Sequence, residues 1–136
     1  MREEARHIDP DKLTAANKDL TDRIEREGAD LLYDATLDTL FIEFGGPKEA
    51  LSEHVVDNIM LRIDPNTLQI VGCEIIDFFS DFVPNNRLVR DVLGVSGLKE
   101  GKDSRVCLME PRYKALRDMI EAAIPQLAQA VGASSP

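Results

Sequence analysis

The sequence predicts an α+β domain, with a four-stranded antiparallel β-meander covered by an N-terminal helix and C-terminal helices. Apolar residues in 10–27 recur at three- and four-residue spacing, as they do along one face of a helix. In 29–76 they alternate with polar residues between turn signals, as in half-buried strands. In 77–131 the helical spacing returns. We expect residues 1–136 to form a single domain.

The N-terminal helix is predicted from Pro10 to Glu27. Asp9 is placed to cap its start, and Gly28 can supply the left-handed residue that ends it. Its apolar stripe is narrow and consists of Leu13, Ala16, Leu20 and Ile24. Such a stripe fits two arrangements, docking on the chain's own sheet or pairing with the same helix of a second copy.

Four strands are predicted, Leu31–Tyr33, Thr39–Phe44, Val55–Ile63 and Leu68–Ile76. The second and third are separated by Lys48–Glu53, which reads as a loop or a single helical turn. Between the third and fourth, Asp64 and Pro65 occupy the first two positions of a type I turn. The strands therefore follow one another as a meander with one face meant for burial.

The helical part begins with Asp77, which can cap a short turn that carries Phe78, Phe79 and Phe82. A second short helix is predicted after Asn85, with Leu88, Val89 and Val92 as its apolar side. The stretch Gly94–Arg105 has the Gly, Ser and charge content of a loop. A short strand over Val106–Met109 and a long amphipathic helix over Pro111–Val131 complete the chain.

The segment from Tyr33 to Ile75 resembles a family of small bacterial proteins, the domain-of-unknown-function family 2283. The residues that carry the resemblance are Tyr33, Asp34, Asp38, Leu40, Ile42, Glu53, Asp57, Ile59, Leu61, Gly72, Glu74 and Ile75. The resemblance implies a compact antiparallel sheet with a helix and no known activity. Some relatives look like companions of small toxin-type proteins, which favours a protein-binding role.

Composition narrows the functional classes. The chain has 25 acidic and 16 basic residues and a formal net charge of −9, which disfavours nucleic acid and anionic membrane as partners. A basic protein remains a possible partner. The two cysteines lack metal-ligand spacing, and no apolar run approaches the length of a membrane helix. The N-terminus has no secretory signal, so we expect a cytoplasmic protein. We expect neither a metal nor a cofactor.

Glu74 stands in an apolar run and is the first catalytic candidate. A bulge at Gly72 would turn its carboxylate inward, where burial would raise the pKa and make it a general base. The alternative is a carboxylate that faces solvent or pairs across the hairpin with Arg62. His54, with Asp57 three residues later, is the other acid–base candidate. No nucleophile or phosphate-loop motif accompanies them, and the turn aspartates bind local backbone, so no metal site is expected.

Phe41, Met60 and the phenylalanine cluster exceed what one face of a four-stranded sheet needs. Either helices cover both faces, or one surface meets another molecule. We therefore expect a non-catalytic, self-associating interaction protein, a homodimer in which Phe41, Met60 and Arg62 contribute to binding. The alternative is a small enzyme or ligand-binding protein with a pocket between the sheet and the Gly94–Arg105 loop. There Glu74, His54 and Asp57 would act, and Arg62 would orient an acidic substrate.

Overall fold

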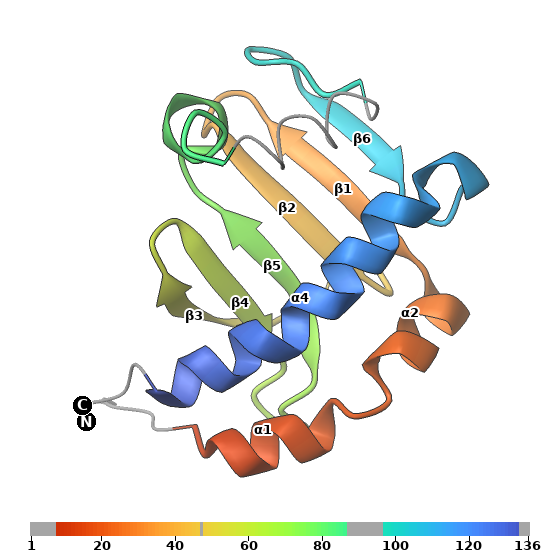
Figure 1. Cartoon of the computed structure of the whole chain (residues 1–136), viewed down its shortest axis with the longest axis vertical. Helices are drawn as coiled ribbons and strands as arrows, with labels where there is room; N and C mark the ends of the chain where they lie inside the picture. The colour runs from red at the N-terminus through yellow and green to blue at the C-terminus, as the bar shows by residue number, and fades with distance from the viewer. Residues whose placement is uncertain (1–7, 47, 87–96, 134–136) are drawn as a thin grey trace.

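The computed structural model describes residues 8–46, 48–86 and 97–133. It confirms the α+β class with an antiparallel sheet, but the sheet has six strands within the described residues and not four. The strands are β1 Ala29–Asp34, β2 Thr39–Phe44, β3 Leu51–Val56, β4 Ile59–Ile63, β5 Ile70–Ile75 and β6 Ser104–Cys107. The long helix α4 (Lys114–Ala133) crosses the sheet, and α1 (Pro10–Ala16) and α2 (Leu20–Glu27) lie beside it (Figure 1).

The strand order is β3-β4-β5-β2-β1-β6, and every neighbouring pair is antiparallel. The hairpin β1–β2 and the meander β3–β4–β5 are joined because β5 pairs with β2 in the middle of the sheet. The last strand, β6, pairs with β1 at residues 104–107, two residues before the short strand that the sequence predicts.

The single strand predicted over Val55–Ile63 is wrong, because the chain reverses in the middle of it. Asp57 has a φ of +48° and, with Asn58, forms the tight turn between β3 and β4. Asn58 Nδ2 donates to the carbonyl oxygen of Ile76 at 2.7 Å, which ties this turn to the end of β5. Strand β3 therefore includes residues 51–53, where the sequence predicts a loop or helical turn.

The N-terminal helix is two helices, because Asn17 interrupts it. Asn17 Nδ2 donates to the carbonyl oxygens of Leu13 at 2.8 Å and Leu68 at 2.9 Å, and Oδ1 accepts from the amide of Ile70 at 2.7 Å. Asparagine competes with the helix for backbone groups in this way. The side chain thus ends α1 and fixes it to the segment that enters β5.

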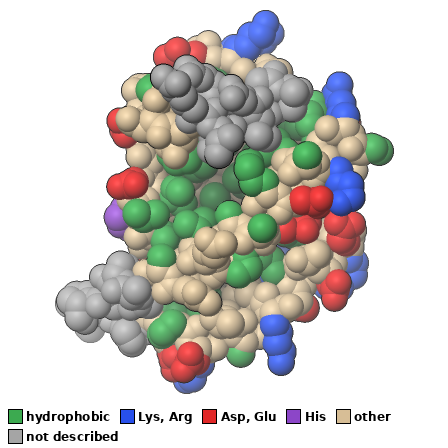
Figure 2. Space-filling view, viewed as in Figure 1, with side chains coloured by type: hydrophobic (Ala, Val, Ile, Leu, Met, Phe, Trp, Pro, Cys, Tyr) green, Lys and Arg blue, Asp and Glu red, His purple; other side chains and the backbone are tan. Residues whose placement is uncertain are grey.

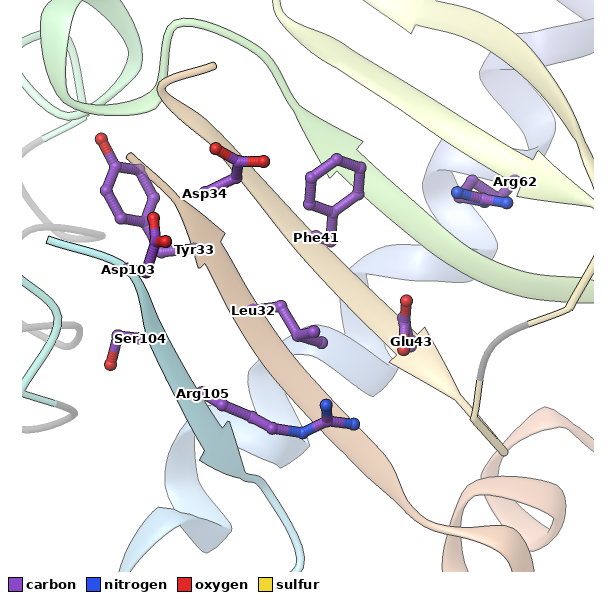
Figure 3. Close-up of a pocket in the computed structure, with 9 residues that line it drawn as sticks. All are labelled: Leu32, Tyr33, Asp34, Phe41, Glu43, Arg62, Asp103, Ser104 and Arg105. Carbon is purple, nitrogen blue, oxygen red and sulfur yellow. The ribbon is translucent and has the colours of Figure 1, made fainter. Parts of the chain in front are cut away.

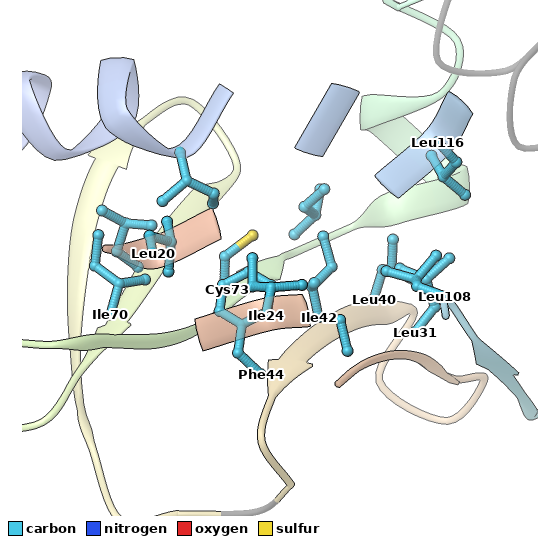
Figure 4. Packing of buried hydrophobic residues seen from close by; sticks show 14 of the residues in the cluster. Leu20, Ile24, Leu31, Leu40, Ile42, Phe44, Ile70, Cys73, Leu108 and Leu116 are labelled. Atoms are coloured by element: carbon cyan, nitrogen blue, oxygen red, sulfur yellow. The ribbon is translucent and has the colours of Figure 1, made fainter. Parts of the chain in front are cut away.

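The predicted stripe of the N-terminal helix packs on the chain's own sheet. Leu13, Leu20 and Ile24 are buried and Ala16 is half-buried. Asp9 caps α1 by accepting the amide of Asp11 at 2.9 Å, as predicted. Figure 4 shows Leu20 and Ile24 beside core residues of the central strands. The buried core includes Leu31, Leu40, Ile42, Phe44, Ile70, Cys73, Leu108, Leu116 and Ile124.

The phenylalanine cluster packs in this core, and a residue distant in the sequence caps the helical turn that carries it. Phe78, Phe79 and Phe82 lie in a π-helical turn, Phe78–Phe82, with the Phe79 ring 5.0 Å from the ring of Tyr33. The predicted cap, Asp77, makes no side-chain hydrogen bond to this turn. Asp38 caps it instead.

Asp38 lies between β1 and β2 with a φ of +50°. Its Oδ1 accepts from the Tyr33 hydroxyl at 2.6 Å and from the Phe79 amide at 3.0 Å, and its Oδ2 accepts from the Ser80 amide at 3.0 Å. Burial opposes the charge of this carboxylate, but the hydrogen bonds outweigh it, so the pKa of Asp38 is lowered.

The C-terminal helix α4 follows a 3-10 turn, Pro111–Tyr113, close to the predicted start. Arg117 is buried on it and donates from Nη1 to the carbonyl oxygen of Leu108 at 2.8 Å, which fixes α4 to the segment after β6. The short helix predicted after Asn85, with Leu88, Val89 and Val92, lies outside the described residues.

We predict that Asp38→Asn lowers the free energy of unfolding by about 2 kcal/mol at pH 7, because the hydrogen bonds to a charged acceptor are weakened. Asparagine tolerates the positive φ, so the backbone need not change. The lowered pKa means that the ionised form favours the folded state. This stability is present above the usual aspartate pKa of about 3.9 and is lost as the pH falls through the lower folded value.

Urea unfolding over a pH series measures this. The unfolding free energy of the wild type should fall more steeply than that of Asp38→Asn as the pH drops below about 5. Asp22→Asn, at an exposed position on α2, is the control and should behave as the wild type. Parallel curves for the wild type and Asp38→Asn would contradict the assignment.

Candidate interaction surface on the open sheet face

The face of the sheet turned away from α4 is here called the open face. Figure 3 views it, with α4 on the far side of the strands. Among the described residues no helix covers this face, whereas the opposite face meets α4 through core residues such as Leu40, Ile42 and Cys73. Side chains alternate along strands, so every second residue of each strand faces this side.

Strand register aligns the open-face side chains in two rows that cross the sheet from β3 to β6. The first row is His54, Met60, Glu74, Phe41, Leu32 and Arg105. The second row is Ser52, Arg62, Gly72, Glu43, Asp30 and Cys107. The first row holds the apolar residues Met60, Phe41 and Leu32, with Glu74 between Met60 and Phe41. The second row holds the charged residues Arg62, Glu43 and Asp30.

Leu32 and Phe41 are neighbours on β1 and β2, and both lie flat over the strands in Figure 3. Met60 lies in the same row on β4, separated from Phe41 by Glu74. All three apolar side chains are only half-buried, unlike those of the core. They form the apolar part of the open face.

Two ion pairs flank the apolar residues. Arg105 Nη2 lies 2.9 Å from Asp30 Oδ2 at one side of the sheet, and this hydrogen bond raises the pKa of the Arg105 guanidinium. At the other side, Arg62 Nη1 lies 3.4 Å from Glu74 Oε2, with the side chains 26% and 17% exposed. The predicted pairing of Glu74 with Arg62 is confirmed.

Gly72 leaves a gap in the second row. A Cβ at this position would collide with the carbonyl oxygen of Ile42, because β5 approaches β2 closely here. The register of β4 and β5 shifts at Val71, one residue before the predicted bulge, so Ile70 faces the core whereas Glu74 lies on the open face. Next to the gap, Glu43 Oε1 is buried and has no hydrogen-bond partner in the described part of the chain.

The open face is hollowed over these residues. The hollow has a volume of about 600 Å³ and reaches from Arg62 on β4 across Phe41 and Leu32 to Asp103 and Arg105. A concavity between the sheet and the end of the Gly94–Arg105 segment is thus present, as the ligand-binding alternative requires. Its walls carry both arginines together with Asp34, Glu43 and Asp103, so neither sign of charge dominates.

The three catalytic candidates do not converge. His54 Nε2 lies 2.9 Å from the carbonyl oxygen of Asp57, so the histidine contacts the backbone of the turn. Glu74 contacts Arg62 and the hydroxyl of Ser52. His54 and Glu74 share a row but stand two strands apart, about 10 Å. None of the three lines the hollow.

The three predicted binding residues, Phe41, Met60 and Arg62, do share the open face. Leu32, Asp30, Glu43 and Arg105 stand in the same two rows but were not predicted as binding residues. The alternation of residues in β2 places Glu43 on the same face as Phe41, and the alternation in β1 contained the signal for Leu32 and Asp30. Arg105 had none, since it ends a stretch with the composition of a loop.

Other chemistry has little support in the described residues. Cys73 is buried, and this burial raises the pKa of its thiol to about 12, which keeps it protonated and unreactive. No group of three metal-ligating side chains occurs in the described ranges. Within the same ranges, the helices are all too short or too polar to cross a bilayer.

Comparison with known proteins returns no match to a family model, to a curated protein or to a solved structure. The resemblance to the domain-of-unknown-function family stays a prediction.

We predict that Gly72→Ala costs about 2 kcal/mol of unfolding free energy, because the new methyl group must push β2 and β5 apart. Chemical denaturation measures it. Ser52→Ala, in the same row on the exposed edge strand, should change stability by less than about 0.5 kcal/mol. Equal, small effects of the two changes would show that the close approach at Gly72 is not required.

Proposed function

We propose that this chain is a non-catalytic interaction protein that associates with a second copy of itself through the open face. The observation that supports this best is the uncovered row of Leu32, Phe41 and Met60 with charges of both signs beside it. Full burial of one such side chain contributes about 1.5–3 kcal/mol, so covering three half-exposed ones favours association.

The order of the strands makes the open face complementary to itself. Two sheets that pack face to face keep their strands within about 30° of each other. A two-fold axis along the strands, between β5 and β2, places β1 of one copy opposite β4 of the other and β2 opposite β5. Leu32 then meets Met60, and Asp30 meets Arg62.

The same arrangement gives the carboxylate of Glu43 a partner in the second copy. On β2 it faces Gly72 of the second copy, where no side chain occupies the row and where Arg62 is the next residue. The Glu43 carboxylate oxygen that lacks a partner among the described residues would enter this gap and reach the guanidinium of Arg62. A buried polar atom without a partner is costly, so a partner that satisfies it stabilises the complex.

A second copy fits this surface better than a basic protein does. The whole chain has a net charge of −9, but the two rows of the open face carry three carboxylates and two guanidinium groups. A basic partner would need an acidic surface. Glu74 stands two strands away from His54, and His54 contacts the backbone carbonyl oxygen of Asp57, which supports a role without catalysis.

We predict that Phe41→Thr raises the dissociation constant of the homodimer at least about tenfold, because it removes the ring at the centre of the interface. Threonine keeps the preference for a strand. Size-exclusion chromatography with light scattering over a dilution series measures this. Leu37→Thr is the matched control, since Leu37 is 58% exposed in the turn after β1 and lies off the open face.

A wild-type chain that stays monomeric throughout the series would contradict the proposed function. So would a dimer that responds equally to the changes at Phe41 and Leu37.

Charge reversal at Asp30 and Arg62 tests whether these two residues face each other across the dimer. Asp30→Lys places a cation opposite Arg62 of the second copy, and Arg62→Glu places an anion opposite Asp30, so each single change should weaken association about tenfold or more. The double variant restores opposite charges and should recover most of the affinity. Sedimentation equilibrium measures association, and circular dichroism melting curves check that each variant is folded.

If the double variant associates no better than the single ones, the two residues do not face each other. The dimer would then use another geometry of the same face.

A further inference from the structure

A second candidate site lies on the other side of the sheet. Between α4, the π-helical turn and the core face of the strands there is a cavity of about 140 Å³. Ile59 and Ile75 line it from the sheet, Phe82 from the turn, and Met119, Ile120 and Ala123 from α4. In Figure 2 hydrophobic side chains surround a hollow on this side of the molecule.

The described residues give the cavity no polar wall. Every described side chain that lines it is apolar, except that the thiol of Cys73 contributes its small, uncharged surface. Water needs two to four polar partners to stay in a cavity, and the described lining offers none. Apolar protein cavities of about 150 Å³ remain dry and bind molecules such as benzene. An aromatic ring or a short alkyl chain therefore suits this space.

The cavity adjoins a polar depression. Ile59 and Phe82 line both, so the two lie side by side at these residues. The depression is also lined by Asp57 and Asn58 at the turn between β3 and β4 and by Asp81 near the end of the π-helical turn. It thus brings two aspartates to this side of the apolar cavity, here called its mouth.

The amide nitrogens of the three asparagines around this mouth each donate at least one hydrogen bond within the chain. Asn58 Nδ2 donates to the Ile76 carbonyl oxygen at 2.7 Å. Asn85 and Asn86, which also line the depression, donate in the same way to the carbonyl oxygens of Asp81 and Phe82, each at 2.8 Å. Carboxylate and amide oxygens are the acceptors in this wall, so the mouth suits a ligand group that donates hydrogen bonds and carries a positive charge.

We propose that this cavity binds a small primary amine with an apolar ring or short alkyl chain, whose apolar part enters between α4 and the sheet. The ammonium group lies at the mouth, near the carboxylates of Asp57 and Asp81. Shape and apolarity select the body of the ligand, and the two charges select its end. This site is independent of the open face.

Three ligands of similar size separate these contributions: benzylamine, toluene and benzoate. With the full chain, two-dimensional NMR titration should give benzylamine a dissociation constant about fivefold lower than that of toluene, the size of an exposed ion-pair effect. Benzoate should bind most weakly. Equal affinity for benzylamine and toluene would overturn the role of the carboxylates, and the absence of binding by all three would overturn the site.

Variants locate the site. Ala123→Leu fills the cavity from α4 and should abolish binding of benzylamine, while Ala122→Leu, on the exposed side of the same helix, should leave it unchanged. The double change Asp57→Asn with Asp81→Asn should leave toluene binding unchanged and remove the preference for benzylamine. Melting curves establish folding. Binding of benzylamine to folded Ala123→Leu, or a preference that survives the double change, would contradict the proposal.

Discussion

The pairing of β2 with β5 is the interaction on which the rest of this structure depends. It joins the hairpin β1–β2, with β6 attached, to the meander β3–β4–β5 and so makes one sheet from two units. Gly72 permits the contact, because a side chain there would collide with the carbonyl oxygen of Ile42. The register across this junction also aligns the open-face residues of all six described strands in two continuous rows.

The two faces of the sheet differ in what covers them, and successive residues of β5 show the difference. Cys73 lies in the core against the cavity beneath α4, whereas Glu74 lies on the open face in an ion pair with Arg62. The two proposals therefore use opposite sides of one strand. A dimer formed through the open face leaves the amine site accessible, and ligand in that site need not disturb the dimer.

Local signals in the sequence predicted the helix cap at Asp9, the strand β2 and the pairing of Arg62 with Glu74. The sequence did not predict the chain reversal between β3 and β4. It also did not predict the helix ends that depend on residues distant in the chain. Asn17 ends α1 by binding Leu68 and Ile70, about fifty residues away in the chain. Asp38 caps the π-helical turn, where Asp77 was expected. The rows of the open face depend on a strand order that no local pattern contains, so only Phe41, Met60 and Arg62 were anticipated.

The most direct test of the open-face interface is a filtered NOE measurement on a dimer mixed from isotope-labelled and unlabelled chains. Leu32 on β1 and Met60 on β4 stand three strand spacings apart in one chain, about 14 Å, so their methyl groups are too distant for a cross-peak within it. The proposed arrangement predicts a cross-peak between the Leu32 methyl groups of one copy and the Met60 methyl group of the other. A dimer without that cross-peak, or with intermolecular contacts only from α1 and α2, would contradict it.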